Sequence, residues 1–358
     1  MSVHVVIAAG GTGGHVFPAL AVARELQARG ATVSWLGTQR GLEADVVPAA
    51  GIEIDWVSVF GLRGNGIVGW LKAPWRLFKS VQQAKQALRK RHASVVLGMG
   101  GFVAGPAGIA AKLAGVPLVI HEQNSVPGMT NRYLAKVANR VLVAFPSVFA
   151  NMPKRQYVGN PIRREIVDVL SPQQRRRPDE VKRLLVVGGS LGAAALNEIV
   201  PLALARIDAH ERPEVWHQTG KKNLDEAKRA YASARVEANV VPFIDSMADA
   251  YAWADLVICR AGALTVAELA AVGSASILVP YPSAVDDHQT SNGRFLVDAG
   301  AAIMVQQKVL TPEILSEYLQ DLFAQPEKLQ NMAIKARELA LPRASEVVAN
   351  ICLEQAHV

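Results

Sequence analysis

The feature that most constrains the fold is a repeated alternation of continuous apolar runs with amphipathic stretches. Runs rich in Val, Ile and Leu occupy residues 3–9, 32–37, 54–59, 94–99, 117–122 and 141–145, with helical patterns at 16–29, 73–91 and 129–138. The pattern begins again at 183–190 and continues through a helix near 192–206, runs at 214–219, 239–244 and 255–260, a helix near 264–272 and a run at 276–281. Parallel strands that are covered on both faces are apolar throughout. The order therefore predicts an α/β protein with two doubly wound parallel-sheet domains.

The length of 358 residues also favours two domains, because it exceeds what one hydrophobic core usually serves. The polar, proline-bearing stretch 159–180 predicts the boundary, so we expect domains at 1–162 and 163–341 and a C-terminal helix at 342–358. Cys259 and Cys352 are distant and show no zinc-ligand spacing, which suits a reducing compartment. We interpret the apolar start as a buried first strand, not a signal peptide, and find no run long enough to span a bilayer.

The net charge of +7 is unevenly distributed along the chain. Residues 1–160 hold 17 Lys and Arg against 6 Asp and Glu, whereas the remaining residues hold 21 against 25. The first part therefore carries +11 and the second −4. This asymmetry predicts an anionic partner for the first part, and nucleic acid, a phosphorylated substrate and anionic lipid all qualify.

Glycine-rich loops follow three of the expected strands, at AAGGTGGH (8–15), GMGGFVAGP (98–106) and VGGSLGAA (187–194). In parallel α/β domains such loops lie at the ligand-binding edge of the sheet, and the helix that follows presents N–H groups to anions. We therefore expect phosphate groups at this edge of both domains. Val16 breaks the dinucleotide fingerprint counted from Gly11, and no GxxxxGK[ST] motif is present.

Seven segments carry a family resemblance: AAGGTGGHVFPALAVA (8–23), GMGGFVAGP (98–106), HEQNSVPGMTNR (121–132), VGNPIR (158–163), VVGGSLGA (186–193), HQTGK (217–221) and CRAGALTVAEL (259–269). In this order they resemble the MurG family of bacterial N-acetylglucosaminyltransferases over nearly the whole chain. The resemblance implies the GT-B fold, in which two Rossmann-like domains face each other across a cleft. It also implies that the C-terminal helix crosses back to the N-terminal domain.

The activity implied by the resemblance is inverting transfer of N-acetylglucosamine (GlcNAc) from UDP-GlcNAc to lipid I. The acceptor would be the C4 hydroxyl of its N-acetylmuramyl (MurNAc) pentapeptide, and the product lipid II of peptidoglycan synthesis. The location implied is the cytoplasmic face of the bacterial inner membrane, with other cell-wall synthesis proteins as candidate partners and no nucleic acid.

In the N-terminal domain we expect the catalytic base among two residues. His15 should lie in the first turn after the glycine loop, where it could take the acceptor proton or only bind a phosphate. Glu122 is the second candidate. The resemblance implies donor contacts for Asn124 and for Thr12, Gly13 and Gly14, with the acceptor diphosphate as the other ligand for that turn. For His121 and Gln123, local structural hydrogen bonds are an equal alternative.

In the C-terminal domain the resemblance implies a UDP-GlcNAc site. Arg163 and Ser190 would bind the diphosphate, although Ser190 could equally be a helix N-cap. Ile244 would contact uracil and Gln289 the GlcNAc hydroxyls, while the role of His288 stays open. Backbone N–H groups in the segment that leads to Glu268 would also bind the diphosphate, and Glu268 the ribose hydroxyls; the alternative for Glu268 is a first-turn helix acid. This segment contributes Ala263, Leu264, Thr265, Val266 and Ala267.

We expect no required cofactor and no structural metal, because Asp286 and Asp287 do not form an Asp-x-Asp at a strand end. Helix dipoles and arginine can neutralise the leaving diphosphate instead, and stimulation by a divalent ion stays open. Residues 66–79 interleave Trp70, Trp75 and Phe78 with basic residues. This composition favours an anionic membrane surface over an ordinary helix with a buried aromatic stripe.

Three other functions are alternatives to the transferase interpretation. A UDP-GlcNAc 2-epimerase would share the donor but leave the aromatic and basic segment 66–79 unexplained. A nicotinamide-dependent oxidoreductase would need an acid after the second strand, where the sequence has Gly37-Thr38-Gln39. A nucleic-acid-binding protein is suggested by the pI of 9.5, but no binding module or aromatic stacking platform is apparent in the sequence.

Overall fold

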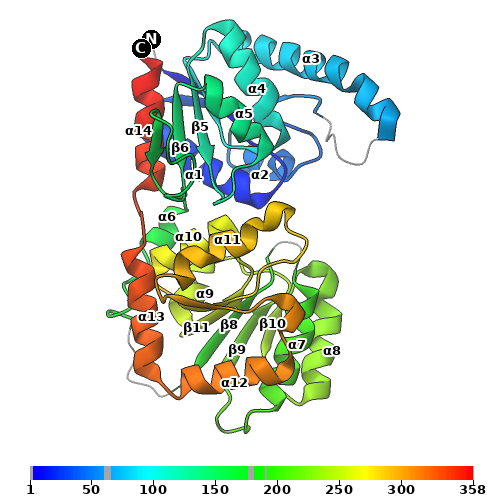
Figure 1. Cartoon of the computed structure of the whole chain (residues 1–358), viewed down its shortest axis with the longest axis vertical. Coiled ribbons are helices and arrows are strands. Elements are labelled where there is room, and N and C mark those ends of the chain that lie inside the picture. Colours follow the sequence, from blue (N-terminus) through cyan, green and yellow to red (C-terminus); the bar gives the residue numbers. More distant parts are fainter. Residues whose placement is uncertain (1–2, 60–65, 176–180, 190–191, 358) are drawn as a thin grey trace. The chain divides into compact units, whose positions relative to one another are not determined.

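The structure is a computed structural model that describes residues 3–59, 66–175, 181–189 and 192–357, with side chains described outside 66–72 and 285. The chain divides into unit 1, Met1–Arg163 with Leu341–Val358, and unit 2, Arg164–Ala340 (Figure 1). The first division lies one residue from the boundary expected at 162. Each unit is a parallel α/β sandwich, which confirms the fold class expected from the alternating pattern.

Unit 1 contains a seven-stranded parallel sheet in the order β3-β2-β1-β4-β5-β6-β7. The strands are β1 (His4–Ala8), β2 (Thr32–Gly37), β3 (Glu53–Trp56), β4 (Val95–Gly98), β5 (Leu118–Glu122), β6 (Arg140–Val143) and β7 (Arg155–Tyr157). The helices are α1 (Gly13–Ala28), α2 (Glu43–Ala49), α3 (Gly66–Lys90), α4 (Gly101–Ala114), α5 (Met129–Val137) and α14 (Ala344–Ala356). The order of strands reverses between β1 and β4, the place where ligands bind in such sheets.

The C-terminal helix completes the core of unit 1. Helix α14 packs against α1 and also contacts β4 and β5 (Figure 1). Its residues Val348 and Cys352 are fully buried in the same cluster as Val5 and Ile7 of β1. Helices α3, α4 and α5 form a second group, in which neighbours pack side by side. The sheet is thus covered on both faces, which explains why its central strands are apolar throughout.

Unit 2 contains a six-stranded parallel sheet in the order β10-β9-β8-β11-β12-β13. The strands are β8 (Arg183–Val187), β9 (Glu214–Gln218), β10 (Asn239–Val241), β11 (Leu256–Cys259), β12 (Ala275–Leu278) and β13 (Ala302–Met304). The helices are α6 (Arg164–Val167), α7 (Ala194–Ala205), α8 (Leu224–Ala234), α9 (Met247–Trp253), α10 (Ala263–Val272), α11 (His288–Val297), α12 (Pro312–Phe323) and α13 (Pro326–Glu338). Short 3₁₀ turns occupy Lys221–Asn223, Val285–Asp287 and Gln307–Val309. Here the strand order reverses between β8 and β11.

Candidate functional site

The two glycine loops of unit 1 interlock at the strand-order reversal between β1 and β4. A Cβ atom on Gly101 would lie 2.3 Å from the carbonyl oxygen of Gly10, so only glycine lets the loops approach this closely. A Cβ on Gly100 would lie 2.9 Å from the imidazole of His15, and both glycines have positive φ, +96° and +76°. The motif at 98–101 therefore leaves room for the loop and the histidine that follow β1.

The start of α1 brings Thr12, Gly13 and Gly14 together at this edge. Thr12 is the N-cap, and its carbonyl accepts from the N–H groups of His15 and Val16 at 3.1 and 3.2 Å. The N–H groups of Gly13 and Gly14 precede these and by position have no acceptor within the helix. Their partial positive charge, added to the helix dipole, suits a phosphate oxygen.

His15 lies in the first turn of α1 and is held by a residue from the end of β5. Its Nδ1 lies 2.9 Å from the side-chain oxygen of Gln123. The amide nitrogen of Gln123 lies 3.1 Å from Nδ1 of His121 and 3.2 Å from the His121 carbonyl oxygen. Nε2 of His121 lies 2.9 Å from the carbonyl oxygen of Gly159. A continuous chain of hydrogen bonds therefore runs from Gly159 through the buried His121 and Gln123 to His15.

Glu122, the second candidate for the base, has a different task in the structure. Its side chain is buried, and one oxygen accepts from the N–H of Asn124 at 2.9 Å. The other accepts from the N–H of Gly128 at 3.0 Å and from the amide of Asn131 at 2.9 Å. Both oxygens are thus engaged by the loop that follows β5. Glu122 therefore holds this loop and positions Asn124, while its role as a base, like that of His15, stays a prediction.

Glu43 was missed by the sequence reasoning, although it shapes the same loop. This carboxylate is fully buried at the start of α2. One oxygen accepts from the N–H of Gly11 at 2.9 Å, and the other from the N–H and hydroxyl of Thr38 at 3.0 and 2.8 Å. Glu43 therefore ties the glycine loop to the end of β2. Nothing in the local sequence distinguishes it from an ordinary first-turn helix acid.

In unit 2 the loop after β8 lies at the strand-order reversal. Ser190 lies outside the described residues. The preceding Gly189 is clamped by Gln218 at the end of β9, whose side-chain oxygen accepts from the Gly189 N–H and whose amide donates to the Gly189 carbonyl, both at 3.0 Å. Gln218 also donates to the Pro242 carbonyl at 3.2 Å. Gln218 of the HQTGK segment therefore fixes the backbone of the glycine loop of unit 2.

Helix α10 follows β11 after a three-residue loop. Only some of the N–H groups that we expect to bind a diphosphate are available at its start. The N–H of Val266 donates to the carbonyl of Gly262 at 2.9 Å, so it is taken, and Ala267 lies further inside the helix. The N–H groups that face out of the helix start are those of Ala263, Leu264 and Thr265. This corrects the expectation that Val266 and Ala267 offer backbone N–H groups to a diphosphate.

Glu268 lies in the second turn of α10, which excludes the alternative of a first-turn helix acid. Its carboxylate is buried and accepts a hydrogen bond of 3.1 Å from the hydroxyl of Tyr251. Gln289 is the second residue of α11, and its side-chain oxygen accepts from the Tyr281 N–H at 2.9 Å. The guanidinium of Arg260 lies 5.5 Å from the centre of the Tyr281 ring, so a cation lies next to the residue that bonds Gln289.

The remaining expected residues are placed by their elements and their burial. Ile244 is buried in the loop between β10 and α9, and Arg163 is the last residue of the first segment of unit 1. Asp286 and Asp287 are exposed, with positive φ of 54° and 48°. Within the described ranges, no group of three or more His, Cys, Asp or Glu residues could hold a metal ion.

Two family models match the chain. The glycosyltransferase family 28 N-terminal domain matches residues 5–143, and the C-terminal domain of the same family matches residues 183–348. Among curated proteins, the UDP-N-acetylglucosamine--N-acetylmuramyl-(pentapeptide) pyrophosphoryl-undecaprenol N-acetylglucosamine transferase of Stutzerimonas stutzeri is 54% identical over 100% of both chains. The transferase of the same name from Alkalilimnicola ehrlichii is 54% identical over 99% of this chain and 100% of its own.

Solved structures agree with these matches. MurG of Acinetobacter baumannii is 41% identical, with a TM-score of 0.84, and the match covers 98% of this chain and 99% of that one. A UDP-GlcNAc 2-epimerase from Neisseria meningitidis is 13% identical with a TM-score of 0.67, over 99% of this chain and all of that one, which shows likeness of fold alone. The expected GT-B fold is confirmed. The chain therefore belongs to the MurG family of N-acetylglucosamine transferases within glycosyltransferase family 28.

Proposed function

We propose that this protein transfers GlcNAc from UDP-GlcNAc to the C4 hydroxyl of the MurNAc-pentapeptide of lipid I, which gives lipid II. The observation that carries the proposal is the imidazole of His15, which Gln123 holds in the first turn of α1. It lies next to the N–H groups of Gly13 and Gly14, which suit an anion. An inverting transfer needs one base at the acceptor hydroxyl and stabilisation of the charge that develops on the departing UDP. The described residues supply groups suited to both tasks.

In the proposed reaction the acceptor oxygen attacks the anomeric carbon of GlcNAc. Nε2 of His15 takes the hydroxyl proton while the bond from the anomeric carbon to the UDP oxygen breaks. Gly13 and Gly14 offer N–H groups to an acceptor phosphate. A proton thus moves from the acceptor to His15, and the bonding electron pair leaves with UDP.

We assign donor binding mainly to residues of unit 2. The N–H groups at the start of α10 and the guanidinium of Arg163 suit the diphosphate, and the buried carboxylate of Glu268 suits the ribose hydroxyls. Ile244 and Gln289 are assigned to uracil and to the GlcNAc hydroxyls, and Asn124 to the donor sugar. The N–H groups of α10 and the guanidinium of Arg163 neutralise the leaving diphosphate by hydrogen bonds, helix dipole and charge; whether a divalent ion adds to this is open to experiment.

The membrane surface that we propose lies on α3, α4 and α5, because lipid I keeps its polyprenyl tail in the bilayer. On α3, Trp75 is 70% exposed and stacks on Phe78, 53% exposed, with ring centroids 5.8 Å apart. This geometry opposes the alternative of a buried aromatic stripe, although Trp70 has no described side chain. Met129 and Tyr133 form an exposed row on α5, where the Lys136 ammonium lies 5.7 Å from the Tyr133 ring. Aromatic and cationic side chains together suit the headgroup zone.

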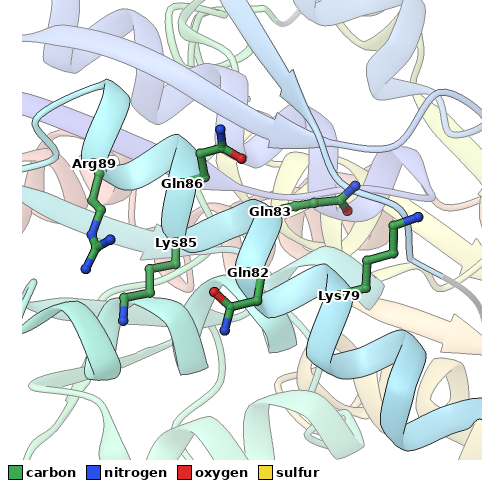
Figure 2. Close-up of a pocket in the computed structure, with 6 residues that line it drawn as sticks. All are labelled: Lys79, Gln82, Gln83, Lys85, Gln86 and Arg89. Atoms are coloured by element: carbon green, nitrogen blue, oxygen red, sulfur yellow. The ribbon is translucent and has the colours of Figure 1, made fainter.

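Basic residues continue along α3 beyond this apolar surface. A depression of about 320 Å³ lies on this helix and is lined by three cationic and three amide side chains: Lys79, Lys85, Arg89, Gln82, Gln83 and Gln86. Figure 2 shows these side chains on α3. Each cation near an anionic bilayer is worth about 1 kcal/mol of attraction. In the part of the chain that is described, no helix is long and apolar enough to cross a membrane. We therefore propose peripheral attachment at the cytoplasmic face of the inner membrane.

The test is to identify the product. The purified protein is incubated with UDP-GlcNAc and a short-chain lipid I analogue, and the product is analysed by mass spectrometry and by NMR of the new linkage. We expect a β-1,4-linked disaccharide and one UDP per disaccharide. Parallel reactions without acceptor test for epimerised UDP-sugar. Epimerised sugar without disaccharide would overturn the proposal in favour of a 2-epimerase, and neither product would refute both.

A further inference from the structure

We infer that Gln123 and His121 are positioning residues that hold His15 in the tautomer with its proton on Nδ1, which leaves the lone pair of Nε2 for the acceptor hydroxyl. The inference rests on the proposed transferase function for its catalytic meaning. The hydrogen-bond chain that carries it is a property of unit 1 alone.

The hydrogen bond between His121 and Gly159 sets which group donates and which accepts along the whole row of hydrogen bonds. The carbonyl oxygen of Gly159 can only accept, so Nε2 of His121, at 2.9 Å, must donate. His121 is fully buried, and this burial lowers its pKa to about 4. The ring is therefore neutral near pH 7 and carries one proton, on Nε2. Its Nδ1 is consequently an acceptor.

The side-chain amide of Gln123 links the protonation of His121 to that of His15. A side-chain amide has a donating nitrogen and an accepting oxygen. The group that faces Nδ1 of His121, at 3.1 Å, must donate, and it also lies 3.2 Å from the His121 carbonyl oxygen, a second acceptor. Both neighbours thus select the NH₂ end. The amide oxygen is left for His15, and because it only accepts, Nδ1 of His15 at 2.9 Å must carry the proton.

Gln123 cannot rotate to reverse this choice without cost. It is 1% exposed, and a flipped amide would place its oxygen against two acceptors on His121. A buried polar group without a hydrogen-bond partner is unfavourable, so the NH₂ end stays towards His121. Gly100 lies at the same Nδ1 edge of the ring and, because it has no Cβ, leaves room there for the imidazole. His15 is thus held at this edge, with its Nδ1 proton bound to Gln123 and its Nε2 carrying the lone pair.

The tautomer is tested directly by NMR of protein labelled with ¹⁵N in its eight histidines, among which the His15 signal is identified by its loss in His15→Gln. We expect nitrogen shifts of an Nδ1–H imidazole for His15 and of an Nε2–H imidazole for His121. An Nε2–H form of His15 in the unmodified protein would overturn the inference, whatever the activity. If the protein made no disaccharide but His15 were Nδ1–H, the function would fail while the positioning stood.

A matched pair of variants then tests the consequence. Gln123→Met keeps the length of the side chain but removes the acceptor. We expect it to lower kcat about 10- to 100-fold, less than the roughly 10²- to 10⁴-fold loss of a removed general base because His15 is still present, and to shift His15 towards Nε2–H, with KM for UDP-GlcNAc unchanged. Gln355→Met, at another buried glutamine of unit 1, is the control and should leave kcat and the tautomer unchanged.

A third variant separates positioning from general damage to the fold. In His121→Phe the Gln123 amide keeps one selecting acceptor, the backbone carbonyl of residue 121. We expect a smaller loss of kcat than in Gln123→Met and a His15 that remains mainly Nδ1–H. If Gln123→Met left the tautomer and kcat unchanged, or lowered kcat without changing the tautomer, the positioning role would be wrong.

Discussion

The interlocked glycine loops allow a test in which two variants of one helix differ in a single contact. Gly101 begins α4 and Gly115 follows its end, with φ of +76° and +70°. A Cβ on Gly115 would meet no atom within 4 Å. Gly115→Ala should therefore lower the free energy of unfolding only by the strain of alanine in a left-handed backbone, about 1–2 kcal/mol. A Cβ on Gly101 would also meet the Gly10 oxygen at 2.3 Å, more than 1 Å inside ordinary contact.

Because the atom in its way is backbone, Gly101→Ala can be accommodated only by moving the loop that precedes α1. Such overpacking costs about 1–3 kcal/mol, so we expect Gly101→Ala to be less stable than Gly115→Ala by that amount. A loop shift of about 1 Å also costs about 100-fold in rate, so kcat should fall in Gly101→Ala alone. Urea unfolding followed by circular dichroism measures the difference. Equal stabilities, within about 0.5 kcal/mol, and equal kcat would refute the interlocked-loop argument.

Three further predictions follow from the site and its surroundings. Glu268→Gln should raise KM for UDP-GlcNAc about 10-fold with kcat unchanged, because a charged partner of the ribose hydroxyls is lost; steady-state kinetics checks this, and an unchanged KM would contradict the ribose role. Trp75→Ser should weaken sedimentation with vesicles that contain anionic lipid while activity on a soluble acceptor persists; unchanged binding would contradict the proposed surface. Burial lowers the pKa of His121 to about 4 and of His217 to about 3, against 6.5 in the unfolded chain. The unfolded state therefore binds more protons below pH 6.5, and stability should fall between pH 6.5 and 4, by up to about 1.4 kcal/mol per pH unit for each histidine. The His217→Phe variant should show a shallower fall in urea titrations, and an unchanged slope would contradict the assignment.

The sequence predicted the layers of the fold well because buried parallel strands leave a strong local pattern. Strand β2 begins and ends at the residues expected, and α10 differs by one residue from its expected start. The three-residue strands β7 and β13 were not expected, because so short a run carries no readable periodicity. Helix α1 begins at Gly13, ahead of the apolar pattern at Val16, because its first turn faces the loop and not the core.

The site was less predictable because its side chains are paired across long stretches of chain. The family motifs indicated His15 and Gln123, but not that they bond to each other across 108 positions. The sequence indicates Glu122 as a candidate base because it ends a strand, and only the folded loop shows three donors at its carboxylate. Glu43 gives no sequence signal, since its partner Gly11 lies 32 positions away in the loop after β1.

The most direct test of the central claim, that His15 takes the acceptor proton, is the rate of disaccharide formation by His15→Ala beside the unmodified protein. Both are measured from pH 5 to 9 at saturating UDP-GlcNAc, with donor affinity determined separately. We expect a fall in kcat of about 10²–10⁴-fold, unchanged donor affinity and loss of the acid limb of the kcat/KM profile. A His15→Ala variant that keeps near-normal turnover and the same acid limb would contradict it.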